Sequence, residues 1–175
     1  MTSTLKLTYG IKQGELTHVA DVVSGLGCDC VCPACGEKLV AKKGRSRQHH
    51  FAHSNVSECK YGVETALHLA AKKILEQKTE ITLPEIEVKF YSPRASFFLS
   101  PERSYKIDKV VLESRVGEII PDVLAYINGR PLLIEICVTH KVSHEKGRYI
   151  KDELGLSSIE IDLSRASREL GIEDI

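Results

Sequence analysis

Apolar and polar residues alternate along the N-terminal part of the chain, which indicates β structure. Within residues 1–27 the apolar positions recur at every second residue: Leu5, Leu7, Tyr9 and Ile11. That period is typical of a half-buried strand. Gln13-Gly14 then predicts a turn, and Leu16–Val23 is expected to be the returning strand.

A second pattern, between residues 119 and 141, predicts a β-hairpin. Asn128-Gly129 separates two β-rich runs, so Val123–Ile127 and Leu132–Val138 should pair antiparallel. This hairpin would bring Asp122 and Glu135 to the same end of the sheet. Because buried charge is costly unless it is paired or bound to metal, the two carboxylates favour a hard divalent cation such as Mg²⁺. The alternative is that Asp122 begins a strand in solvent and Glu135 pairs with a nearby Lys or Arg.

The remaining pattern predicts a chain of helices and strands around a mixed sheet. A helix is expected over residues 62–77, and a second over 143–154 with Ser143 as its N-cap and Gly155 as its end. The other expected elements are strands Ile81–Phe90, Tyr105–Glu113 and Ser157–Ile161, a loop Ser92–Glu102, and a last helix Arg165–Leu170. The strand after helix 143–154 should run parallel to Leu132–Val138. This order predicts an α/β (α+β) fold, with a β-rich zinc module over residues 1–60 and a second domain over 61–175.

Composition narrows the class of protein. The chain has 175 residues, 42% of them hydrophobic and 27% charged, which suits one globular domain with a small appendage. Its formal net charge is zero, so nucleic acid could be bound only through a local basic patch. We expect no membrane association and a cytoplasmic location, because no apolar run is long enough to span a membrane and no signal-peptide pattern is present. Six cysteines in such a chain favour metal ligands or free thiols over disulfides.

Residues 28–59 carry a metal-binding pattern. Cys32-Pro-Ala-Cys35-Gly36 has the form of a zinc knuckle, in which backbone N–H groups turn towards both sulfurs. Tetrahedral zinc needs two more ligands, and three candidates follow: His50, His53 and Cys59. His50 with His53 could form a second knuckle, or His53 with Cys59 could bridge into the next helix. His49 is a weaker candidate, Cys28 and Cys30 are expected to be flanking thiols, and a redox CxxC pair is the alternative to zinc.

The same segment is basic. Lys42, Lys43, Arg45 and Arg47 lie in a predicted hairpin close to the cysteine and histidine cluster. A charge run is often only a solvated face. A hairpin made rigid by zinc would also be a suitable surface for phosphate contacts, and we expect these four residues to supply them.

Three polar residues follow one face of the predicted helix 62–77. Glu64, His68 and Lys72 are spaced by four residues, so they form a stripe along that face. The stripe could be a solvated face with an ion pair. It could also deliver a third carboxylate to a site with His68 and Lys72 behind it. Glu113, at the end of a predicted strand, is a weaker addition to the same acidic site.

Four segments together resemble the CoiA-like competence-protein nuclease family of the PD-(D/E)xK superfamily. They are CPACG, HFAH, the helix ETALHLAAKKIL, and PDV followed by IEI. The resemblance extends from Cys32 to about Ser164. It implies a restriction-endonuclease-like sheet flanked by helices, Glu64 as the helical acid, Asp122 and Glu135 as ligands of a catalytic Mg²⁺ or Mn²⁺, and the two Cys/His segments as a structural zinc module.

The chain departs from the superfamily pattern at one position. The superfamily's lysine would stand where this chain has Cys137, and Lys72, Lys141 or His140 could replace it, with Lys72 favoured. We expect a metal-dependent nuclease acting on DNA, with catalytic residues Glu64, His68, Lys72, Asp122 and Glu135. The alternatives are a catalytically inactive nucleic-acid-binding accessory protein and a zinc-stabilised protein-interaction module. The expected partner is nucleic acid, in the first place DNA, and a homodimer is one assembly that this chain allows.

Overall fold

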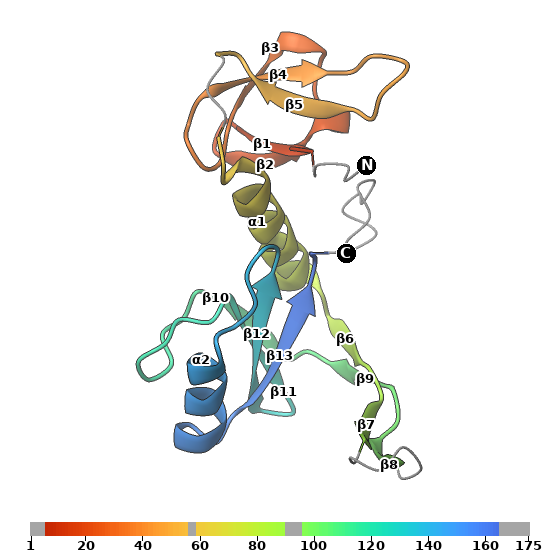
Figure 1. The fold of residues 1–175 in the computed structure, drawn as a ribbon, viewed down its shortest axis with the longest axis vertical. Coiled ribbons are helices and arrows are strands. Elements are labelled where there is room, and N and C mark those ends of the chain that lie inside the picture. The colour runs from red at the N-terminus through yellow and green to blue at the C-terminus, as the bar shows by residue number, and fades with distance from the viewer. Residues whose placement is uncertain (1–5, 56–58, 90–95, 165–175) are drawn as a thin grey trace. The chain divides into compact units, whose positions relative to one another are not determined.

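The computed structural model describes residues 6–55, 59–89 and 96–164 (Figure 1). By their contacts the residues form two compact units, each made of several chain segments. The first unit comprises residues 1–74, 136–142 and 160–175, and the second comprises residues 75–135 and 143–159. The predicted domain boundary after residue 60 remains a prediction. The architecture is a mixture of helices and strands in which strands predominate.

The first unit is built on a five-stranded sheet in the order β2-β1-β3-β4-β5. Its strands are β1 (Tyr9–Lys12), β2 (Glu15–His18), β3 (Gly25–Val31), β4 (Lys38–Lys42) and β5 (His50–His53). The buried side chains of this sheet form one cluster, to which helix α1 (Gly62–Gln77) contributes Ala66 and Ala70. Tyr9, Leu39 and Phe51 are the large members of that cluster. The β-rich character that the alternation predicts for this segment is confirmed.

Two predicted boundaries in this sheet are corrected. The returning strand β2 ends at His18, and a 3₁₀ turn over Val19–Asp21 follows it, with the His18 side chain accepting a hydrogen bond from the backbone of Ala20. In the predicted basic hairpin, β4 ends at Lys42 and β5 begins at His50, so Lys43, Arg45 and Arg47 lie in the connection over residues 43–49 and not in its strands.

A four-stranded sheet in the order β10-β11-β12-β13 carries the second apolar pattern. Its strands are β10 (Lys109–Leu112), β11 (Val123–Ile127), β12 (Arg130–Cys137) and β13 (Ser157–Asp162). The predicted hairpin is confirmed: β11 and β12 pair antiparallel, and Asn128 and Gly129 both have positive φ angles, 51° and 73°. Such a pair of angles matches the twist of a two-residue hairpin turn. Figure 1 shows β12 and β13 pointing in the same direction, as the crossover through the second helix predicts.

The region between residues 80 and 113 is more divided than the pattern predicts. The expected strand Ile81–Phe90 is two strands, β6 (Glu80–Leu83) and β7 (Ile86–Lys89), because Pro84 has no N–H to continue the ladder. The expected strand Tyr105–Glu113 is likewise divided into β9 (Arg103–Lys106) and β10. The predicted loop Ser92–Glu102 contains strand β8 (Ser96–Ser100), while residues 90–95 lie outside the described part. Two small antiparallel pairs result, β6 with β9 and β7 with β8.

The second helix begins where its cap predicts. Ser143 accepts a hydrogen bond from the backbone N–H of Lys146, α2 (His144–Arg148) follows, and a π turn over Tyr149–Glu153 ends it. Ile150 on this turn packs with Leu124 of β11 and Leu133 of β12. The last helix expected over Arg165–Leu170 lies outside the described residues. Within the described residues, no helix combines the length and apolar content that crossing a bilayer requires.

Candidate metal centre and acidic strand ends

The CPACG segment forms a tight turn after β3. The backbone N–H of Gly36 donates to the carbonyl of Cys32 over 2.9 Å, and Gly36 has φ of +74°, a conformation in which glycine is favoured. The backbone N–H of Cys32 donates to Glu37 over 2.8 Å and closes the turn. This turn places the sulfurs of Cys32 and Cys35 at one end of the sheet, as the knuckle pattern predicts.

His53 and Cys59 complete the set of ligands. The ligand atoms of Cys32, Cys35, His53 and Cys59 all lie within 4.8 Å of one another. The two sulfurs of Cys32 and Cys59 are 3.9 Å apart, and Cys35 Sγ lies 3.4 Å from His53 Nε2. Sulfur ligands in a zinc tetrahedron stand about 3.8 Å apart, because each lies about 2.3 Å from the metal. The four residues therefore fit one zinc ion in a closed, structural site.

His50 is not part of this cluster, for a reason that lies in strand geometry. Residues 50–53 form β5, where successive side chains point to opposite faces, so His50 and His53 diverge. His53 shares a face with the core residue Phe51, whereas the ring of His50 bonds through Nδ1 to the carbonyl of Gln48 over 2.9 Å. Of the two arrangements that the sequence leaves open, the structure has the one with His53 and Cys59.

The first residue of helix α1 lies directly against the cluster. A Cβ atom at Gly62 would stand 3.3 Å from the sulfur of Cys32 and 3.5 Å from that of Cys59. The backbone N–H of Gly62 also points to the carbonyl of Cys59 over 3.5 Å. A glycine at this position lets the helix begin beside the ligands without crowding them.

Cys28 and Cys30 are core residues, as expected for flanking thiols. Both are buried in β3, where Cys28 donates to the carbonyl of Leu39 and Cys30 donates to the carbonyl of Cys28. Burial raises the pKa of the Cys30 thiol to about 11, so this thiol stays protonated at neutral pH. A protonated thiol bonded to a carbonyl is a weak metal ligand.

The thiols of the cluster differ in their electrostatic environment. Burial raises the pKa of Cys32 to about 11, whereas the backbone N–H of Glu37 lowers the pKa of the exposed Cys35. Zinc binds thiolates, so its binding must displace the proton of Cys32.

Comparison with known proteins identifies this same segment. A family model described as "Competence protein CoiA, N-terminal domain" matches residues 27–62. The match includes all four candidate ligands and ends at Gly62, the residue packed against them. No curated protein matches the chain, and no solved structure matches it. The resemblance to CoiA is thus supported for the metal-binding segment, which is well under half of the chain.

The second unit has acidic residues near the ends of three strands. Val123 pairs with Ile134 at the end of the β11–β12 ladder, and Asp122 and Glu135 are the residues next to that pair in the chain. On the other side, the backbone N–H of Glu113 donates to the carbonyl of Asp122 over 3.2 Å. Asp122 and Glu135 therefore lie at the same end of the β11–β12 ladder, as the hairpin predicts.

Glu135 is the one buried charged side chain of the described residues, with 6% of its surface exposed. Lys146 Nζ lies 2.7 Å from its Oε1, and 28% of the lysine side chain is exposed. The contact has the distance of an ion pair but not the geometry of a hydrogen bond. Lys146 stands one helical turn before Ile150, which packs on Leu133, two residues before Glu135 in β12. The packing of this turn thus holds the ammonium over the carboxylate.

The other candidate cations have different partners. Lys141 pairs with Asp162 over 3.7 Å. His140 Nδ1 lies 3.7 Å from Glu64, and the hydroxyl of Thr139 lies between them, 2.5 Å from Glu64 and 2.7 Å from His140. Cys137, at the position where the sequence resemblance implies a lysine, is buried, and burial raises the pKa of its thiol. This position therefore supplies no positive charge at neutral pH.

The sequence reasoning missed Lys146 and Thr139. The Ser143 N-cap is a signal for Lys146, because it fixes the start of α2 and places Lys146 on the same helix face as the buried Ile150. The sequence has no comparable signal for the contact of Thr139 with Glu64. Glu64, His68 and Lys72 lie on α1 in the first unit, and Asp122 and Glu135 lie in the second. Their convergence on one site remains a prediction.

Proposed function

We propose that this chain is a metal-dependent nuclease that hydrolyses phosphodiester bonds in DNA, with a restriction-endonuclease-like core. The observation that carries the proposal is the buried Glu135, which lies with Asp122 at the same end of the β11–β12 ladder. The match of residues 27–62 to the CoiA N-terminal domain supports it. A cytoplasmic location is part of the proposal, because six cysteines without a disulfide pattern in the sequence favour metal ligands or free thiols.

Asp122 and Glu135 would hold Mg²⁺ or Mn²⁺, which take carboxylate oxygens and keep water molecules as further ligands. When bound, such an ion activates water and neutralises charge on the scissile phosphate. Glu64, steadied by the Thr139 hydroxyl, is the third carboxylate that we propose for this site. His68 would orient the attacking water as a general base.

Lys146 is the cation that we propose in place of the superfamily's lysine, instead of the Lys72 favoured from the sequence. Its ammonium already lies 2.7 Å from Glu135, whereas the residue at the superfamily position is a buried thiol. A divalent ion at Glu135 would take over the charge compensation that Lys146 supplies. The ammonium could then stabilise the charge that develops on the phosphate in the transition state.

Zinc on Cys32, Cys35, His53 and Cys59 has a structural role in this proposal. Closed sites of four protein ligands leave no position for a substrate, so the ion would organise the first unit and take no part in the reaction.

The test is cleavage of supercoiled plasmid with Mg²⁺, with Mn²⁺, and with EDTA. The parent should cut only with a divalent ion, and Asp122→Asn and Glu135→Gln should each abolish cutting. Glu153→Gln is the matched control, because Glu153 is an exposed acid on the π turn and should cut like the parent. Cleavage that survives in the Asp122 and Glu135 variants would refute this site.

The second candidate function is a nucleic-acid-binding accessory protein without catalysis. The thiol at position 137 favours it, since the lysine of the superfamily pattern is missing there. Under this alternative the parent binds DNA but cuts no form of it with either ion.

A further inference from the structure

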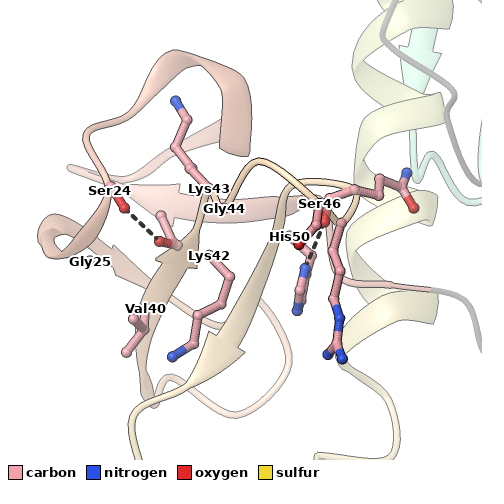
Figure 2. Close-up of a pocket in the computed structure, with 11 residues that line it drawn as sticks. Ser24, Gly25, Val40, Lys42, Lys43, Gly44, Ser46 and His50 are labelled. Carbon is pink, nitrogen blue, oxygen red and sulfur yellow. Dashed lines mark hydrogen bonds between the residues drawn. The ribbon is translucent and has the colours of Figure 1, made fainter.

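The outer face of the β4–β5 hairpin is basic. Leu39 and Ala41 of β4 are buried in the core, and strand alternation therefore turns Val40 and Lys42 to the opposite face. Lys42 pairs in register with His50 of β5, so the two side chains stand side by side on that face. Figure 2 shows the side chains of Lys42 and His50 extending in the same direction from the hairpin.

A groove of about 520 Å³ lies over this face. Its wall includes the basic residues Lys42, Arg47 and His50 and the polar residues Ser24, Ser46 and Gln48, and none of its lining residues is acidic. In a chain whose formal net charge is zero, this is a local concentration of positive charge. A chain without net charge can bind nucleic acid only through a local basic patch, and this groove is such a patch.

Lys43, next to Lys42 in the chain, has a different role. Its ammonium donates to the backbone carbonyls of Ala20 and Val22, both over 2.8 Å. Figure 2 shows its side chain pointing away from that of Lys42. Lys43 thus ties the 3₁₀ turn before β3 to the end of β4 and shapes the groove without offering its charge to a ligand.

His50 is held in place on the groove wall. Its Nδ1 bonds to the carbonyl of Gln48 over 2.9 Å, and since a carbonyl can only accept, Nδ1 carries the hydrogen. The other ring nitrogen, Nε2, is not used by this bond. The ring is therefore oriented before any ligand arrives, which lowers the entropy cost of binding.

We propose that this groove binds the phosphodiester backbone of nucleic acid, with Lys42 and Arg47 on the phosphates and His50 beside them. The identity of the partner rests on the proposed nuclease function, whereas the site itself rests on the groove and its charges. No Phe, Tyr or Trp side chain lines the groove, so it offers none of the large rings on which successive bases usually stack. Contacts of Lys and Arg to phosphate position the strand without reading its sequence, and binding here is therefore independent of sequence.

The experiment measures binding of a labelled DNA duplex and of its single strand by fluorescence anisotropy, in EDTA-free buffer at several salt concentrations. The groove variant is Lys42→Ala with Arg47→Ala. The matched control is Lys12→Ala with Lys38→Ala, which removes the same charge from two strands of the same sheet at positions outside the groove. Each lost duplex phosphate contact should lower the salt slope by about 0.9 and weaken binding roughly tenfold at 0.1 M salt.

The groove variant should therefore lose about two units of salt slope for the duplex. The control should keep the parental slope, and random and defined sequences should respond alike. If the groove and control variants have equal salt slopes for duplex binding, the groove proposal is wrong. The nuclease proposal would still stand if the parent cuts plasmid. A parent that binds DNA through the groove but cuts no plasmid would support the groove and overturn the nuclease. A parent that binds neither DNA form would overturn both.

Discussion

Cys28 and Cys32 lie four residues apart and have different neighbours. Cys28 donates to a carbonyl of β4 within the core, whereas Cys32 meets Cys59 across 3.9 Å at the end of the sheet. His50 and His53 differ for another reason, since one strand turns them to opposite faces. At the scale of single residues, chemistry in this chain depends on where a side chain stands in its strand or beyond the strand's end.

The ion pair of Glu135 with Lys146 is a second case in which the place of a side chain in the fold decides its chemistry. Removing one partner of a buried pair leaves an uncompensated charge, so Lys146→Met should lower the free energy of unfolding by up to about 3 kcal/mol, a low value for such pairs because the lysine is partly exposed. Glu135→Gln with Lys146→Met should be closer to the parent, because neither charge remains. Thermal or urea unfolding of the three variants measures this cycle.

Stabilisation by Mn²⁺, measured as the melting temperature, gives a second test of the same set of variants. A divalent ion at Glu135 replaces the charge of Lys146, and Mn²⁺ should therefore raise the melting temperature of Lys146→Met more than that of the parent. The double variant should show no such rise at this site. If Mn²⁺ stabilises Lys146→Met no more than the double variant, Glu135 is not a ligand.

At the scale of elements, the hairpin β4–β5 links the metal centre to the basic groove. Leu39 pairs with His53 at one end of this ladder, and Lys42 pairs with His50 at the other. The metal ligand His53 fixes the position of β5, and the register then carries that position to the groove. We therefore expect metal binding and groove geometry to be coupled through the backbone hydrogen bonds of this ladder.

Loss of the metal tests this coupling. Cys32→Ser should lower zinc content, measured by elemental analysis, and should weaken the protection of β4 and β5 amides from hydrogen exchange. Cys28→Ser removes a buried thiol of the same sheet and should keep the parental zinc content. A chelator should also weaken duplex binding, and added zinc should restore it. Unchanged exchange in zinc-free protein would show that the hairpin holds its register without metal.

The elements also show which parts of the fold the sequence can predict. The Asn128-Gly129 turn and the Ser143 cap are local signals, and both match the structure. The choice of His53 with Cys59 is not local, because it depends on where β5 begins and on the approach of Gly62 to the sulfurs. The ion pair of Lys146 with Glu135 joins residues on different elements, and only packing around Ile150 reveals it.

At the scale of the whole molecule, the equal numbers of acidic and basic residues conceal an uneven distribution. The chain has 24 of each, yet the groove of the first unit has basic residues and no acidic ones in its wall. The strand ends of the second unit carry Glu113, Asp122 and Glu135. Function in such a chain depends on these local fields, because there is no net charge to recruit a polyanion from a distance.

Under the nuclease proposal, position 137 tests whether cleavage needs a cation anywhere beside Glu135 or a cation at one particular place. Cys137 lies two residues after Glu135 on the same strand face, and the charges of Glu160 and Asp162 reach it, raising the pKa of its thiol after the larger effect of burial. Those same acids would favour an ammonium, which offsets part of the desolvation cost of a buried lysine. Cys137→Lys should therefore fold.

In the Lys146→Met background, Cys137→Lys should restore part of the plasmid cleavage that Lys146→Met removes, because it returns a positive charge next to Glu135. Cys137→Met in that background is the control of similar length without charge and should restore nothing. In the parent, Cys137→Lys should add little, since Lys146 already supplies the cation. A parent that cuts no DNA or RNA, together with a Cys137→Lys variant that does, would instead favour the accessory protein, because the chain would then have kept the nuclease scaffold without its catalytic charge.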